Sequence, residues 1–270
     1  MQASRLLRLL RHLRCPLRPL IAAAFLALLP LAPAAAWTPA TQATIAREAA
    51  RLAPPDLARQ IARHKADYQE GVQAPFADKD ALRHMRNPDG QGSLDRVIAA
   101  EAEATIAAIR AHQPFAEIVR RMGIVSHFVA DANNPLATSG DDPEEGRYFA
   151  DFLRYAQSAE PRFPLLFYGA WPSLNTPRDL DALIAETLRR GRELYPTVGR
   201  EYRRIGFVSG LGIFDDRSSA FGVASVAWSH AVTDVALVLR YIWLRAGGAD
   251  ERTGLSSTGG KLQLIPRSRP

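Results

Sequence analysis

His127 and Asp131 are the residues whose types and spacing are best suited to chemistry, and they lie in the run GIVSHFVADANNPLATS at 123–139. Residues four positions apart share one face of a helix, so an imidazole and a carboxylate would project side by side. The run is apolar and helix-forming, so we expect both side chains to point into a packed interior. Zinc binds His nitrogen and Asp oxygen, and the pair is therefore half of a metal site. The alternative is a core histidine that is hydrogen-bonded to a neighbouring acid.

His84 is a third candidate ligand and lies in the segment RHMRNPDGQG at 83–92. Proline and glycine interrupt this segment, so we expect a loop rather than a helix. A loop histidine is flexible enough to complete a site that begins on a helix. Asp78 and Asp80 stand just upstream and supply further carboxylates.

For two further sets of residues, a role in a functional site is compared with a role in the core. His230 and Asp234 repeat the four-residue spacing on an apolar helix, where a satisfied core pair is the more common outcome. Trp171 lies in the irregular segment FYGAWPSL at 167–174 and is a candidate for lining a cleft. The sequence contains no glycine-rich phosphate loop and no cysteine metal motif.

Residues 1–36 have the pattern of a secretory signal peptide. Five arginines precede the apolar run LIAAAFLALLPL at 20–31, and small residues follow before a cleavage point. The apolar run is short for a membrane span and contains Pro30, so we expect cleavage rather than anchoring. The mature chain would then begin at Trp37, have no transmembrane segment, and be exported to the periplasm or the extracellular space.

Removal of the signal peptide changes what the composition implies. The whole chain has a net charge of +6, and loss of five arginines and no acids leaves about +1. The basic balance therefore does not indicate a nucleic-acid-binding surface. The one cysteine, Cys15, leaves with the signal, so a metal would be bound by His, Asp, Glu or the new amine of Trp37.

The elements that must position these residues are helices, because helical periodicity dominates the mature chain. Apolar residues recur at helical spacing at 42–52, 55–71, 94–112, 114–134, 148–156, 178–195 and 218–245. We find no convincing strand alternation and no repeat. The sequence therefore predicts an all-α fold, a single-domain helix bundle at 37–247, followed by a flexible C-terminal tail at 248–270 that is rich in Gly, Ser and Thr.

Several motifs follow one another in a recognisable order. Trp37 comes directly after the signal, and the segments ARHKADYQEG (62–71), HMRNPDG (84–90) and GIVSHFVADANNP (123–135) follow. With these motifs the chain resembles the zinc-dependent phospholipase C superfamily. That superfamily includes bacterial phosphatidylcholine-hydrolysing phospholipase C, single-strand-specific fungal nucleases and the N-terminal domain of glycosylphosphatidylinositol-specific phospholipase D. The resemblance extends from Trp37 to about Ala246.

The resemblance implies a set of zinc ligands. Asp131 would bridge two ions, one of which would also be bound by the amine and carbonyl of Trp37. Asp78 would be a ligand or, failing that, the catalytic general base, with Asp67 and Asp80 as weaker candidates. The ligands implied in this way are Trp37, Asp78, His84, His127 and Asp131.

The chain also departs from the family pattern. Gln42 stands where the family has a histidine soon after its N-terminus, and Phe76 stands where a ligand Asp is usual. The histidine after the central proline is absent, with Leu136, Ala137 and Thr138 in that segment. A later His-x-x-x-Glu pair is also missing, and that region offers only Glu144, Glu145 and Asp151.

The resemblance therefore implies an exported metal-dependent phosphodiester hydrolase, phospholipase C-like, with a reduced metal cluster. One zinc site is expected rather than a full trinuclear cluster. A phospholipid or another phosphodiester would be the substrate, with peripheral membrane contact, and nucleic acid is less favoured because its binding needs many phosphate contacts. The alternative is a non-catalytic protein of the same fold that retains at most one structural zinc and acts as a binding protein.

Overall fold

The computed structural model describes residues 36–169, 174–249 and 262–268. The expected signal peptide, apart from Ala36, and Trp171 lie outside these ranges. The predicted all-α fold is confirmed. The described elements are, in order, α2 (Pro39–Leu52), α3 (Pro55–Arg63), α4 (Lys65–Gln73), η2 (Ala74–Ala77), η3 (Ala81–His84), α5 (Leu94–Arg110), α6 (Phe115–Ala132), η4 (Pro135–Ala137), η5 (Glu145–Arg147), α7 (Phe149–Ala159), η6 (Glu160–Arg162), β1 (Leu165–Phe167), α8 (Pro177–Arg204), α9 (Ser219–Arg245) and β2 (Gln263–Ile265).

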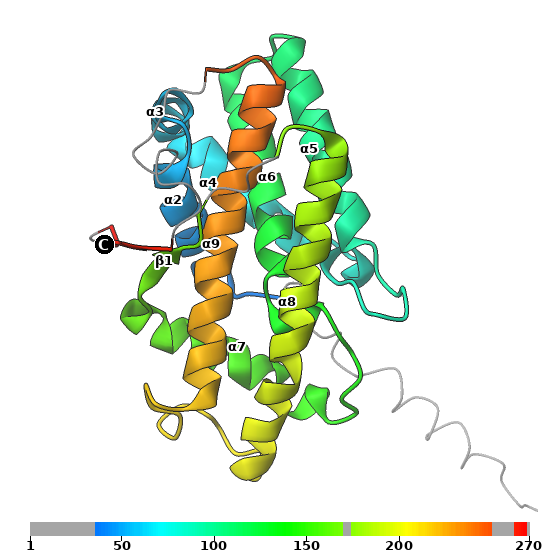
Figure 1. Cartoon of the computed structure of the whole chain (residues 1–270), viewed down its shortest axis with the longest axis vertical. Helices are drawn as coiled ribbons and strands as arrows, with labels where there is room; N and C mark the ends of the chain where they lie inside the picture. Colours follow the sequence, from blue (N-terminus) through cyan, green and yellow to red (C-terminus); the bar gives the residue numbers. More distant parts are fainter. Residues whose placement is uncertain (1–35, 170–173, 250–261, 269–270) are drawn as a thin grey trace, which may run out of the picture. The chain divides into compact units, whose positions relative to one another are not determined.

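Helix α9 runs through the middle of the bundle, and α2, α6 and α8 pack against it (Figure 1). It begins at Ser218, whose hydroxyl accepts a hydrogen bond from the Phe221 backbone N–H. Among the described helices, α9 is the one long and apolar enough to cross a bilayer, and 83% of its apolar window is buried inside the molecule. Its apolar character therefore matches its place in the core.

Helix α8 is longer than its periodicity predicts. Thr176 and Asp179 form a capping box at its start, with Pro177 in the first position. We expected the helix to end near Tyr195, and Pro196, which has no backbone N–H to donate, follows. The helix instead continues to Arg204, and burial of Val198, Gly199 and Tyr202 beyond the proline compensates for the lost hydrogen bond.

The segment expected as one helix at 55–71 is two helices that change direction at His64, where φ is −110° and ψ is 35°. The break directs α4 onto α6. At their crossing, a Cβ on Gly71 would lie 1.9 Å from the Arg120 carbonyl oxygen, and a Cβ on Gly123 would lie 2.3 Å from the Tyr68 carbonyl oxygen. The two backbones therefore touch, which requires glycine at both positions.

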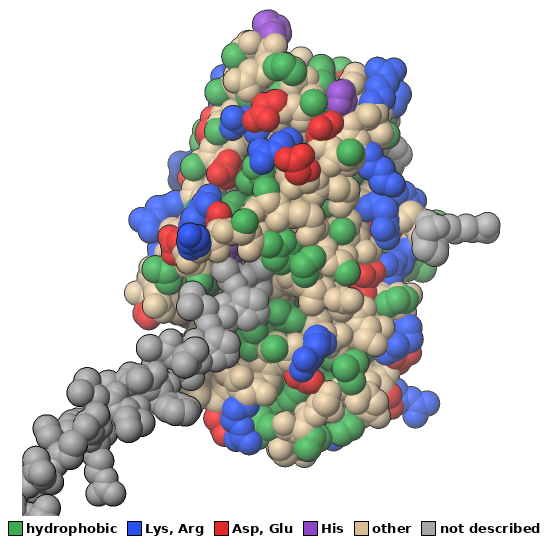
Figure 2. All heavy atoms as spheres, turned by 180° about the vertical axis from the view of Figure 1, so that it is seen from behind, with side chains coloured by type: hydrophobic (Ala, Val, Ile, Leu, Met, Phe, Trp, Pro, Cys, Tyr) green, Lys and Arg blue, Asp and Glu red, His purple; other side chains and the backbone are tan. Residues whose placement is uncertain are grey.

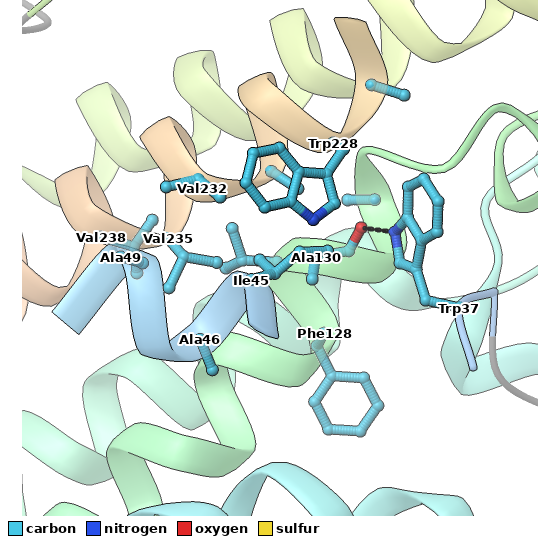
Figure 3. Close-up of a cluster of buried hydrophobic side chains, with 14 of the residues drawn as sticks. Trp37, Ile45, Ala46, Ala49, Phe128, Ala130, Trp228, Val232, Val235 and Val238 are labelled. Carbon is cyan, nitrogen blue, oxygen red and sulfur yellow. Dashed lines mark hydrogen bonds between the residues drawn. The ribbon is translucent and has the colours of Figure 1, made fainter. Parts of the chain in front are cut away.

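One cluster of the hydrophobic core lies between α2, α6 and α9 (Figure 3). Ile45 and Ala49 from α2 face Val235 and neighbouring valines of α9. Trp37 is 1% exposed, and its indole N–H donates to the Ala130 carbonyl oxygen at 2.8 Å. This hydrogen bond fastens the segment before α2 to the C-terminal end of α6.

Part of the expected flexible tail at 248–270 is packed. Residues 263–265 form β2, which pairs antiparallel with β1, so the described part of the chain contains two short strands that the sequence did not indicate. Ser268 follows, and its backbone N–H and hydroxyl donate to Glu48, whose side chain is fully buried on α2. Arg267 pairs with Glu160 and lies over the Trp228 ring. The tail is ordered here because its main chain and side chains pair with groups in the bundle.

Candidate metal centre

Three predicted ligands meet inside the bundle. His127 and Asp131 lie on the last turns of α6 and are fully buried, and His84 ends η3 with 1% exposure. One ligand atom from each lies within 4.8 Å of the other two, and across the described ranges no other such group of three is found. Helix α6 ends at Ala132, and the short η3 turn places His84 beside His127 and Asp131.

His127 has a defined tautomer. Its Nδ1 lies 2.8 Å from the Val72 carbonyl oxygen, which can only accept, so Nδ1 donates and a neutral ring keeps its lone pair on Nε2. Nε2 is buried without a hydrogen-bond partner and lies 3.2 Å from Asp131 Oδ2. Two acceptors that face each other in a dry site are stable only with a proton or a cation between them. This arrangement is typical of a metal-binding imidazole held by a backbone carbonyl.

His84 approaches the same carboxylate from the other side. Its Nδ1 lies 2.7 Å from Asp131 Oδ2, and its Nε2 is buried without a hydrogen-bond partner. The rings of His84 and His127 are 5.3 Å apart and nearly perpendicular. Both imidazoles therefore converge on one carboxylate oxygen, and the three donors are of the nitrogen and oxygen types that zinc accepts.

The Asp131 carboxylate is stabilised in its charged form. Burial raises the pKa of this group, but the adjacent imidazoles of His127 and His84 outweigh burial and hold the pKa below its usual range. Its second oxygen, Oδ1, accepts from Gln42 Nε2 at 2.8 Å and from the Ala36 backbone N–H at 3.3 Å. Asp131 is thus ionised, with Oδ2 facing the imidazoles and Oδ1 facing α2.

The candidate acids differ in how they relate to this group. Asp78 Oδ2 lies 3.6 Å from His84 Nε2 and also accepts from Arg83 Nη1 at 2.6 Å, so Asp78 borders the centre. Asp80 caps η3 through the Leu82 N–H, and Asp67 lies 3.3 Å from His64. None of these three side chains is among the grouped ligand atoms.

The chain around Trp37 also lies at the centre. The Ala36 N–H contacts Asp131, and the Ala36 carbonyl accepts a hydrogen bond from the buried Asn134 side chain. The Trp37 indole N–H is directed at the Ala130 carbonyl oxygen (Figure 3). The Trp37 side chain therefore anchors this segment, and its predicted role as a ligand concerns the backbone.

Gln42 and Phe76 are site residues that the ligand prediction did not include. Gln42 is 1% exposed and donates to Asp131 and to the His127 carbonyl oxygen, and Phe76 packs edge-on against the His127 ring at 4.8 Å. The sequence signal for both was their position where the family has ligands. Val72 supplies only a backbone carbonyl, so no residue type marks it.

The segments in which the histidines of the family pattern are absent make other contacts in the structure. Leu136, Ala137 and Thr138 are buried, and Thr138 packs against Gly191 of α8. Glu145 accepts from Tyr195, and Asp151 accepts from Tyr202 and Ser209. Glu145 links the turn before α7 to α8, and Asp151 links α7 to α8 and to the segment that follows α8.

His230 and Asp234 do not form the expected core pair. His230 stacks on Tyr168 with ring centroids 3.6 Å apart, and burial lowers the pKa of its imidazole to about 4. Asp234 instead accepts from Arg190 Nη2 at 2.5 Å and from Thr187 at 2.8 Å. Both residues lie outside the grouped ligand atoms.

No family model and no curated protein matches the sequence. In structure, the chain is similar to the alpha-toxin of Clostridium perfringens from an avian strain and to the alpha toxin of Clostridium absonum. Each comparison has a TM-score of 0.60 at 12% sequence identity over 78% of this chain. The match covers 65% and 66% of the toxin chains, slightly under two thirds of their length. The resemblance to the zinc-dependent phospholipase C superfamily is thereby confirmed as one of fold.

Proposed function

We propose that the protein is a zinc-dependent phosphodiester hydrolase of the phospholipase C type. One observation carries the proposal: in a fully buried site, His127 Nε2 faces Asp131 Oδ2 at 3.2 Å without a hydrogen bond, beside His84. Zinc, when bound by His84, His127 and Asp131, supplies Lewis-acid activation of water and of a phosphoryl oxygen. The fold that the chain shares with the Clostridium alpha-toxins supports the same reaction class.

Asp78 is the side chain we assign to proton transfer. Its carboxylate borders His84 Nε2 at 3.6 Å, and its side chain is 25% exposed, so it reaches both the buried centre and solvent. Arg83 fixes its position through a hydrogen bond of 2.6 Å. A carboxylate placed in this way takes the proton of the attacking water and passes it to solvent.

A phospholipid is the substrate class we propose, with contact at a membrane surface. Val208, Leu211 and Ile213 are about half exposed and lie in the α8–α9 connection. Asp151 holds this connection by accepting from Ser209 and from the Gly210 N–H, so the apolar side chains stand on a fixed loop. Figure 2 shows hydrophobic side chains, with basic and acidic ones beside them, at the end of the molecule where Figure 1 places the connection.

The test is hydrolysis by the mature protein, loaded with zinc and purified without a tag before Trp37. Phosphatidylcholine vesicles and the soluble diester bis(p-nitrophenyl) phosphate are the substrates, and Asp78→Asn is the matched variant. We expect the variant to retain zinc and to lose at least about a hundredfold in rate. A zinc-loaded protein that cleaves neither substrate contradicts the proposal and supports the alternative, a binding protein with one structural zinc.

Export is a separate part of the proposal. We propose that residues 1–36 are removed and that the protein acts in the periplasm or outside the cell. N-terminal sequencing of protein recovered from the periplasmic fraction of a bacterial host should begin at Trp37. An intact N-terminus in the cytoplasmic fraction contradicts this part alone.

A further inference from the structure

Gln42 is buried on α2 at the edge of the candidate centre, and its amide orientation follows from its neighbours. Its amide faces Asp131 Oδ1 at 2.8 Å and the His127 carbonyl oxygen at 3.3 Å. Both neighbours are acceptors, so the NH₂ group must face them, and the flipped amide would place oxygen against oxygen. Gln42 therefore donates both of its N–H groups at the centre.

These donations decide which oxygen of Asp131 is free. Oδ1 accepts a hydrogen bond from Gln42 at 2.8 Å, whereas Oδ2 faces the two imidazoles. A carboxylate that bridges two cations needs a lone pair on each oxygen directed at an ion. With Oδ1 hydrogen-bonded to Gln42, Asp131 presents Oδ2 to a cation that binds beside the imidazoles.

The remaining atom of Gln42 is also informative. Its Oε1 is buried and has no hydrogen-bond partner among the described residues. A buried acceptor without a donor is costly, and in native proteins such an atom is commonly satisfied by a bound water or ligand. Gln42 Oε1 is therefore an acceptor without a hydrogen bond, next to the Asp131 carboxylate to which the same side chain donates.

We propose that Gln42 is a positioning residue that limits the centre to a single zinc ion by holding Asp131 as a one-oxygen ligand. This inference rests on the proposed function, because it takes zinc as the ion bound by His84, His127 and Asp131. Outer-shell partners of this kind change metal affinity by about 10- to 100-fold. Removal of the amide should therefore weaken zinc binding without changing the ligands themselves.

The experiment measures zinc per chain by elemental analysis, and zinc affinity by competition with a chromophoric chelator. Gln42→Leu removes the amide, and Gln42→Asn keeps it but shortens its reach by one methylene. The control is Gln73→Leu, since Gln73 also donates from its amide, to the Pro39 carbonyl oxygen at 3.2 Å, away from the centre. We expect one zinc per wild-type chain, at least about tenfold weaker binding in both Gln42 variants, and unchanged binding in the control.

The outcomes separate this inference from the function on which it rests. Two or more tightly bound zinc ions in the wild type overturn the single-ion assignment and leave the hydrolase proposal standing. One zinc with unchanged affinity in both Gln42 variants overturns the role of Gln42 alone. No zinc in the wild type refutes the metal-dependent function and this inference together. The thermal midpoint of each metal-free variant shows whether weaker binding reflects unfolding.

Discussion

Gly71 and Gly123 bring the backbones of α4 and α6 into contact, because a Cβ on Gly123 would lie 3.0 Å from the Gly71 carbonyl carbon. Val72 follows directly on α4, and its carbonyl reaches His127 on α6 at 2.8 Å. The close approach of the two helices therefore sets the tautomer of a candidate ligand. A change in helix packing at this point is expected to act on the metal centre.

Gly123→Ala should destabilise the fold and weaken zinc binding together. The added methyl would lie 2.3 Å from the Tyr68 carbonyl oxygen, and overpacking of this kind costs about 1–3 kcal/mol. Gly222→Ala on α9 is the control, since a Cβ there meets nothing within 4 Å and should stabilise the helix by about 1 kcal/mol. Urea unfolding of the metal-free proteins measures the two changes in stability, and competition with a chelator measures zinc affinity. Equal stabilities of Gly123→Ala and the wild type would contradict the backbone contact.

Asp131→Asn should abolish tight zinc binding while keeping the size of the side chain. The amide cannot supply the negative charge that both imidazoles face, so metal content should fall to background. A ligand that binds only the folded state stabilises it by about 2.7 kcal/mol at a hundred times its Kd. Zinc should therefore raise the thermal midpoint of the wild type and not that of the variant. Equal zinc content in the two proteins would remove Asp131 from the ligand set.

Glu145 predicts a pH dependence of stability. Burial, opposed by the Tyr195 hydrogen bond and aided by the nearby charge of Asp142, raises the pKa of Glu145 to about 7. The folded protein then binds a proton that the unfolded chain releases near its ordinary pKa of about 4.3. The stability that this proton contributes is complete below that value and is lost as the pH rises through about 7.

Glu145→Gln removes this titration while keeping an acceptor for Tyr195. We expect the wild type to lose free energy of unfolding relative to the variant between pH 4.5 and 7, with a constant difference above pH 8. Guanidinium unfolding at a series of pH values measures the difference. A difference that does not change over this range would mean that Glu145 titrates normally.

The exposed loop at the α8–α9 connection should govern binding to lipid. The triple change Val208→Ser, Leu211→Ser and Ile213→Ser removes apolar surface that contributes about 1.5–3 kcal/mol for each side chain when fully buried. We expect at least a tenfold loss of cosedimentation with phosphatidylcholine vesicles and unchanged hydrolysis of the soluble diester. Leu264→Ser, at a residue that is 70% exposed on β2, is the control. Equal loss in the control would point to non-specific hydrophobic adsorption.

Much of the fold followed from local patterns in the sequence. Helical periodicity predicted the ends of α5, α6 and α9 to within a few residues. Each of these helices buries one side or its whole surface, so its apolar residues form a clear pattern in the sequence. Periodicity missed the break at His64 and the continuation of α8 past Pro196, since both depend on packing against other helices. The pairing of β1 with β2 spans about a hundred residues and leaves no local signature in three-residue strands.

The candidate centre was less fully predictable. The spacing of His127 and Asp131 follows from helix geometry, so their proximity could be read directly from the sequence. Placement of His84 beside them required the order of the motifs, because a loop carries no periodicity. The role of the Val72 carbonyl could not be predicted, since every residue has a backbone carbonyl. Gln42 was noted only because it departs from the family pattern. Side-chain type therefore indicates ligands, whereas the groups that orient them emerge from the packing.

The contact between Ser268 and Glu48 joins residues that lie 220 positions apart in the sequence. Glu48 is fully buried on α2, yet two of the groups that donate to its carboxylate belong to the segment after β2. Separation of that segment from the bundle would leave a buried carboxylate with fewer donors, which is costly. We therefore expect α2 and the segment after β2 to lose their structure together, as one cooperative unit in hydrogen exchange.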